Sequence, residues 1–136
     1  MDQHRILLVE DELFIRELYE RTLSQSGFII STAVDGLEAL ELAKNKPDLI
    51  LLDIMLPKMH GIDVLKRLKA DQNTKDIPVV LITNLGQESV ITEAFSIGAQ
   101  GYIMKMRLSP YEIVDKVKEF LQNPQQKMNI KSLGLE

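Results

Sequence analysis

The sequence predicts an α/β fold, a doubly wound parallel sheet of five strands that alternate with helices. Five short apolar runs rich in Ile, Val and Leu support this prediction, at residues 6–9, 28–34, 49–52, 79–82 and 102–104. Unbroken apolar runs are typical of strands that are covered on both faces, as in a parallel sheet. Each run is followed by a segment of helical period, so we expect right-handed crossovers between successive strands.

The first two helical segments carry start and stop signals. The first begins at Glu12, and Gly27 after its last apolar position is suited to a C-terminal cap. The second begins with Asp35 as N-cap and has Glu38 three residues later, which is a capping-box pattern. Pro47 closes the second segment. Both segments are therefore expected to form helices between strands.

Three further helices are expected at residues 61–71, 87–98 and 109–121. The last has the strongest start signal, with Ser109 as N-cap, Pro110 at the first position and Glu112 completing a capping box. Residues 123–136 are polar and broken by proline, so we expect a tail or the start of a linker there.

Length and composition indicate one domain held together by its apolar core. The chain has 136 residues, 45% of them hydrophobic, and no cysteine. Disulfides, thiolate metal sites and cysteine nucleophiles are therefore excluded, and a reducing compartment fits. The apolar run at 6–9 is too short for a signal peptide or a membrane span. With a net charge of −4 and no basic cluster, direct nucleic-acid binding by this chain is not expected.

The stretch PDLILLDIMLP places one carboxylate, Asp53, directly after a buried run. A charge there is costly unless something requires it. Ligands of open α/β sheets bind outside the carboxyl ends of the strands. Glu10 and Asp11 follow the first run, Thr83 and Asn84 end the fourth, and Lys105 follows the fifth. Chemistry is therefore expected at this edge of the sheet.

If the first and third strands are neighbours, the carboxylates of Glu10, Asp11 and Asp53 converge. Carboxylates this close raise each other's pKa unless a cation neutralises them. An all-oxygen cluster without His or Cys favours a hard divalent ion such as Mg²⁺, with phosphate as a co-ligand. The Thr83 hydroxyl and the Lys105 ammonium are groups that bind phosphoryl oxygens. A carboxylate can itself be the nucleophile and form an aspartyl phosphate.

Four segments, RILLVEDE, LLDIMLPKMHG, VVLITN and GYIMK, occur in this order. Together they resemble the receiver domain of two-component response regulators, over residues 2–122 and in the single-domain arrangement of chemotaxis regulators. The resemblance implies a flavodoxin-like sheet with strand order 2-1-3-4-5. It also implies a cytoplasmic phosphorelay in which a sensor histidine kinase or a phosphotransfer protein phosphorylates the chain, and the chain then controls an output protein or domain.

The resemblance also implies roles for the residues at the metal. Asp53 is expected to be the phosphoacceptor, and Glu10 and Asp11 match the acidic pair that holds Mg²⁺. The backbone carbonyl of Met55 is expected to be a further ligand. Such a domain is a phosphoacceptor rather than an enzyme, with at most slow self-phosphorylation and self-dephosphorylation.

The residues of the fourth and fifth strands are expected to form the switch. Thr83 and Lys105 would contact the phosphoryl group, and Tyr102 matches the switch aromatic that changes rotamer as the threonine hydroxyl moves. The alternative interpretation of Tyr102 is a packed core tyrosine. The output surface would be the fourth helix, fifth strand and fifth helix, in a monomer or weak homodimer that does not bind membranes.

The sequence departs from the family pattern at several positions. Glu10 stands where many relatives have Asp, and its longer side chain allows contact with the ion through water. Met106 follows Lys105, where the family usually has a proline joined by a cis peptide. We expect either a trans Lys105–Met106 bond with a shifted loop or a strained cis bond. Asn84 follows Thr83, where smaller residues are common, and would narrow access to the phosphoryl group.

Met55 and Leu85 flank the site and offer no group to orient an attacking water. Slow self-dephosphorylation is therefore our hypothesis. His4 and His60 are expected to face solvent without a ligand role, and Glu12 to act mainly on the helix dipole.

Three other functions compete with this one. A haloacid-dehalogenase-like phosphatase needs a second acid two residues after the nucleophile, where this chain has Met55. A flavodoxin-like FMN protein needs a Ser/Thr/Gly-rich phosphate loop after the first strand, where this chain has VEDELF. A degenerate receiver that acts only by protein interaction is the third, and it is the interpretation that Met106 leaves open.

Overall fold

The computed structural model describes residues 3–84 and 87–123. Leu85 and nearly all of the tail expected at 123–136 lie outside this part of the chain. No helix within the described ranges is long and apolar enough to cross a membrane.

The strands form one sheet in the order β2-β1-β3-β4-β5, with every neighbouring pair parallel. The strands are β1 (Arg5–Val9), β2 (Ile29–Ala33), β3 (Leu49–Leu52), β4 (Val79–Thr83) and β5 (Gly101–Met104). The helices are α1 (Leu13–Gln25), α2 (Gly36–Ala43), α3 (Gly61–Ala70), α4 (Glu88–Ile97) and α5 (Pro110–Gln122). The predicted fold class and strand order are therefore confirmed.

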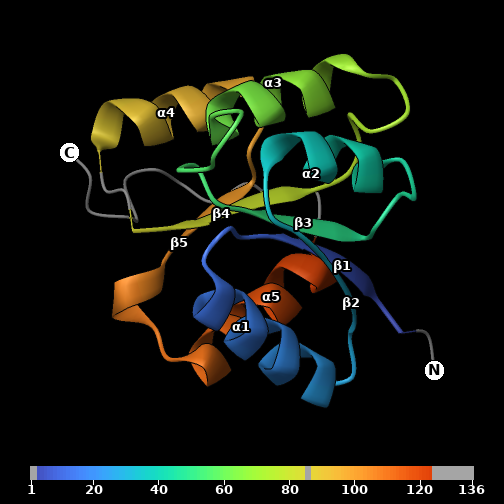
Figure 1. Ribbon diagram of the computed structural model, residues 1–136, viewed down its shortest axis with the longest axis vertical. Helices are drawn as coiled ribbons and strands as arrows, with labels where there is room; N and C mark the ends of the chain where they lie inside the picture. The colour runs from blue at the N-terminus through green and yellow to red at the C-terminus, as the bar shows by residue number, and fades with distance from the viewer. Residues whose placement is uncertain (1–2, 85–86, 124–136) are drawn as a thin grey trace.

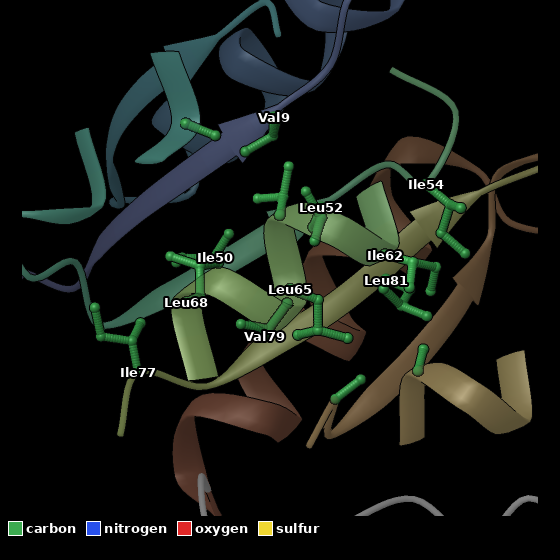
Figure 2. Packing of buried hydrophobic residues seen from close by; sticks show 14 of the residues in the cluster. Val9, Ile50, Leu52, Ile54, Ile62, Leu65, Leu68, Ile77, Val79 and Leu81 are labelled. Carbon is green, nitrogen blue, oxygen red and sulfur yellow. The ribbon is translucent and has the colours of Figure 1, made fainter. Parts of the chain in front are cut away.

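Helices cover both faces of the sheet (Figure 1). Helices α2, α3 and α4 lie on one face, and α1 and α5 lie on the other. The alternate residues of the strands divide between these two cores: Ile50 and Leu52 pack with α3, whereas Leu49 and Leu51 pack with α1 and α5. Figure 2 shows the α3 side, where Ile62, Leu65 and Leu68 of the helix lie over β3 and β4.

Strand β3 is completely buried, which explains its unbroken apolar sequence LILL. It lies between β1 and β4, and both faces are covered, so every side chain meets an apolar neighbour. Strand β2 is at an edge and alternates between exposed and partly buried residues up to its last residue, Ala33, which is buried. The structured strand is shorter than the apolar run at 28–34 because Phe28 and Val34 lie outside the pairing.

The predicted N-caps Asp35 and Ser109 are present, and the full reciprocal capping box is formed at α5. Ser109 and Glu112 form a complete capping box at the start of α5. The Asp35 carboxylate accepts the Glu38 N–H at 2.8 Å, and the Glu12 carboxylate accepts the Ile15 N–H at 2.9 Å. Glu12 is thus a true N-cap of α1, more specific than the dipole role expected for it.

The N-terminus of α3 is held against the end of β3. His60 is exposed, as expected, but its ring Nδ1 also accepts the Ile62 N–H at 3.1 Å and caps the helix. Gly61 allows the close approach, because a Cβ there would lie 2.5 Å from the backbone oxygen of Asp53. The Gly61 N–H donates to the Ile54 oxygen at 2.7 Å, which fixes the backbone next to Asp53.

A short 3₁₀ turn, η1 (Lys105–Arg107), follows β5 and was not expected from the sequence. The described residues contain no cis peptide bond, so the Lys105–Met106 bond is trans. Of the two predicted alternatives, the chain therefore adopts the trans bond, and the turn directs the lysine toward the sheet edge.

Candidate functional site

The site lies at the carboxyl edge of the sheet, where the pairing between strands continues one residue beyond the strands themselves. The Glu10 N–H donates to the Ala33 oxygen at 3.0 Å, at the end of β2. The Asp53 N–H donates to the Val9 oxygen at 3.2 Å, at the end of β1. These bonds place both acidic residues side by side, as the strand order predicts.

Three carboxylates gather at this edge. Oxygen atoms of Glu10, Asp11 and Asp53 all lie within 4.8 Å of one another. Asp11 is exposed, whereas the side chains of Glu10 and Asp53 are only 2% and 7% exposed. The convergence predicted from the sequence is therefore present, with one acid facing solvent and two enclosed by the fold.

Lys105 lies between the two buried acids. Its Nζ is 2.6 Å from Asp53 Oδ2 and also forms an ion pair with Glu10 Oε1. Backbone N–H groups bind the other oxygens: Met55 N–H donates to Asp53 Oδ1 at 3.1 Å, and Glu12 N–H donates to Glu10 Oε2 at 3.3 Å. Every oxygen of the two buried carboxylates thus accepts a hydrogen bond, which offsets the cost of their burial.

The electrostatics reflect burial and this pairing. Burial raises the pKa of Glu10, and the ammonium of Lys105 opposes the rise. Burial alone would lower the pKa of Lys105, but its hydrogen bonds and charge interactions with Asp53 and Glu10 together raise it. Lys105 therefore stays protonated at neutral pH and supplies a fixed positive charge beside Asp53.

The other predicted site residues lie on β4, on β5 and in the segment that follows β3. Thr83 is the last residue of β4, is 1% exposed and pairs with Met104 across the sheet. Tyr102 is buried on β5, on the side covered by α4, and burial raises the pKa of its phenol. Met55 is 61% exposed, and its backbone N–H donates to the Asp53 carboxylate.

One side chain, Arg16, and one contact of the predicted Asn84 were not foreseen from the sequence. Arg16 on α1 donates from Nη1 to the backbone oxygens of Glu10 at 3.1 Å and Asp11 at 3.2 Å, and so holds the acidic loop. The Asn84 Oδ1 accepts the Met106 N–H at 3.0 Å. Arg16 stands at helical spacing from the acidic loop, so its contact with the loop could have been predicted from the sequence. The contact of Asn84 depends on the register between β4 and β5 and could not.

The donor set fits a hard divalent cation. All three acidic side chains offer oxygen, none of the cluster is His or Cys, and the exposed Asp11 leaves the cluster open toward solvent. Two acids held beside a lysine also place carboxylates next to a cation, a combination that can supply a nucleophile and bind an anion.

Comparisons with known proteins agree with this geometry. A family model described as "Response regulator receiver domain" matches residues 6–118. The chain is 45% identical over 115 residues to the phosphate regulon transcriptional regulatory protein PhoB of Escherichia coli, covering 84% of this chain and 50% of that protein. It thus spans about half the length of the curated relatives that it matches.

Solved structures with the same architecture include one that is described as phosphorylated and one that is described as bound to Mn²⁺. The phosphorylated cyanobacterial phytochrome response regulator RcpA matches with a TM-score of 0.78 and 30% identity, covering 94% of this chain and 100% of that chain. The Mn²⁺-bound form of the response regulator Rcp1 matches with a TM-score of 0.78 and 28% identity, covering 93% of this chain and 99% of that one.

Proposed function

Because the chain belongs to the response regulator receiver family, we propose that it serves phosphorelay signalling by accepting a phosphoryl group on Asp53. One observation carries this assignment: Asp53 is a buried carboxylate at the end of the central strand, in contact with Lys105 and adjacent to two further acids. The two solved structures named above are response regulators, and one is described as phosphorylated.

The chemistry is a nucleophilic substitution at phosphorus. A carboxylate oxygen of Asp53 forms a bond to phosphorus while the bond from phosphorus to the imidazole nitrogen of a donor phosphohistidine breaks. The imidazole leaves with the electron pair of that bond and takes up a proton. Asp53 needs no base for this step, because its carboxylate is the nucleophile and carries no proton to remove.

Glu10, Asp11, Asp53 and the backbone carbonyl of Met55 are the groups we assign to a Mg²⁺ ion. When bound, the ion neutralises charge on the acids and on the phosphoryl oxygens and so favours the approach of two anions. Glu10 is held in place for this role by the Glu12 N–H and by its strand-end backbone bond. The Mn²⁺-bound relative Rcp1 supports a divalent ion in this family.

Thr83 and Lys105 are the residues we assign to the phosphoryl oxygens. Lys105 is already directed at Asp53, so its ammonium needs only a short movement to bind an oxygen of the new group. Movement of the Thr83 hydroxyl toward the same group would leave space beside β4, and Tyr102 lies in the core on that side of the sheet. This couples phosphorylation to the surface formed by α4, β5 and α5.

The partners follow from this role. A sensor histidine kinase or phosphotransfer protein would donate the phosphoryl group, and an output protein or domain would respond to the altered surface. The receiver unit is assigned to residues 2–122. We place the protein among phosphoacceptors, with slow self-phosphorylation and self-dephosphorylation, rather than among enzymes that turn over an external substrate.

Intact-mass measurement tests the proposal. The chain is incubated with Mg²⁺ and a small phosphoryl donor, and the wild type is expected to gain one phosphoryl group. Asp53→Asn should abolish the gain, whereas the matched variant Asp76→Asn, an exposed acid in the α3–β4 loop, should retain it. No gain in the wild type, or a gain that persists in Asp53→Asn, would contradict the assignment.

A further inference from the structure

The residue after Lys105 has a backbone N–H, because it is methionine rather than proline. That N–H donates to Asn84 Oδ1 at 3.0 Å. Met106 is 81% exposed, so this residue is held to the protein through its backbone rather than by apolar packing. The two departures of the sequence at positions 84 and 106 therefore meet in one hydrogen bond.

This bond lies between the ends of two neighbouring strands. Thr83 and Met104 are the last paired residues of β4 and β5. Asn84 follows the first, and Lys105 and Met106 follow the second. Lys105 is therefore held on one side by the sheet and on the other by Asn84, which limits the positions that its backbone can adopt.

A defined backbone matters for this lysine because its ammonium is carried on a flexible four-carbon chain. Its Nζ must remain between Glu10 and Asp53, both nearly buried. Each additional freedom in the backbone of the turn η1 adds positions in which the ammonium lies away from the acids.

We propose that Asn84 is a positioning residue for Lys105, acting through the N–H of Met106. The inference rests on the proposed role of Asp53 as phosphoacceptor and names a further residue of the same site. Asn84 restrains by a hydrogen bond a turn that has no proline to restrain it.

The first test does not depend on phosphorylation. Lysines are acylated under limiting reagent, and the rate at Lys105 is measured by peptide mass spectrometry, together with hydrogen exchange at the Met106 amide. Loss of one hydrogen bond corresponds to roughly a two- to tenfold change, so Asn84→Ala should speed both processes by that factor. Asn84→Asp keeps an acceptor oxygen and should behave like wild type, as should the control Asn73→Ala, an exposed residue of the α3–β4 loop.

The second test separates positioning from a general structural role. Phosphorylation by a small donor with Mg²⁺ should be roughly two- to tenfold slower in Asn84→Ala than in wild type. The same substitution should have no further effect in a Lys105→Met background, because Asn84 acts through that lysine. Unchanged acylation and amide exchange in Asn84→Ala would overturn the proposal, and so would a full effect that persists without Lys105. Absence of phosphorylation in wild type would instead count against Asp53, leaving the labelling result to stand on its own.

Discussion

Replacing Lys105 by methionine removes the only cation that forms an ion pair with the buried carboxylates of Glu10 and Asp53 within the described part of the chain. Methionine has a similar length and fills the same volume, so the change tests charge rather than packing. The lysine side chain is 10% exposed, and Glu10 and Asp53 are 2% and 7% exposed. The variant therefore has two nearly buried carboxylates without a counter-charge.

The expected cost follows from the geometry. Two carboxylate oxygens within 4.8 Å of each other repel by about 3.5 kcal/mol at an effective dielectric constant of about 20. Removing one partner of a buried ion pair costs about 3–5 kcal/mol when the pair is fully enclosed. Because Lys105 keeps some contact with water, we expect the variant to lose about 2–4 kcal/mol of unfolding free energy without divalent ions.

Mg²⁺ should return more stability to the variant than to the wild type, because the ion no longer competes with an ammonium for Glu10 and Asp53. Saturating Mg²⁺ at about 100 times its Kd adds about 2.7 kcal/mol. Urea unfolding followed by circular dichroism, with EDTA and with Mg²⁺, measures both effects.

A matched control is Lys44→Met, whose lysine pairs with Glu41 on the surface with side-chain exposures of 64% and 73%. It should change stability by less than about 1 kcal/mol and show no altered response to Mg²⁺. A Lys105→Met variant that is no less stable than Lys44→Met, or that Mg²⁺ stabilises no more than the wild type, would contradict a role for the Lys105 charge in holding the buried acids.

Three further predictions concern neighbouring features. Met55→Asn places an amide beside the site, so decay of the aspartyl phosphate should become about two- to tenfold faster; an already fast wild-type decay that the change leaves unaltered would refute slow self-dephosphorylation. Ser109→Ala removes the N-cap of α5 and should lower the urea-unfolding free energy by about 1 kcal/mol. An unchanged urea midpoint would show that the capping box of α5 does not contribute to stability. The pKa of Asp35 lies below its ordinary value of 3.8 because the Glu38 N–H and Lys58 favour the carboxylate. The contribution of Asp35 to the unfolding free energy is therefore present above pH 3.8 and is lost as the pH falls through the lower native pKa. The stability difference between wild type and Asp35→Asn should shrink below about pH 4, and a constant difference would contradict this.

The sequence was sufficient to predict the sheet and most of the site for one physical reason. Glu10, Asp53 and Lys105 each come directly after a strand, and parallel strands end at the same edge. Given the strand order, the positions of these three residues in the sequence are enough to predict that their side chains lie close together. The buried strand LILL and the capping box at Ser109 were also predictable from the sequence, because each depends on neighbouring residues alone.

Features that depend on the relative placement of distant segments were not predictable in the same way. The Asn84 side chain meets the N–H of Met106, 22 residues away, only because of the register of β4 and β5 and the 3₁₀ turn that follows. The cap of α3 was missed because a histidine ring nitrogen is an uncommon cap acceptor, and His60 otherwise resembles a loop residue. Arg16 lies on α1, and its contact with the acidic loop depends on which way the first turns of that helix face.

The charge on Asp53 is stabilised by Lys105 and by backbone N–H groups rather than by its acidic neighbours. Glu10 and Asp11 add negative charge, so alone they make the carboxylate harder to bury. In the structure, Lys105 and the N–H groups of Met55 and Glu12 compensate for the two buried acids. A bound divalent ion would use the same oxygens as the lysine, so ion and ammonium must influence each other's binding reciprocally. The residues that restrain Lys105 are therefore expected to tune metal affinity as well as phosphorylation, with Asn84 acting on both from outside the acidic cluster.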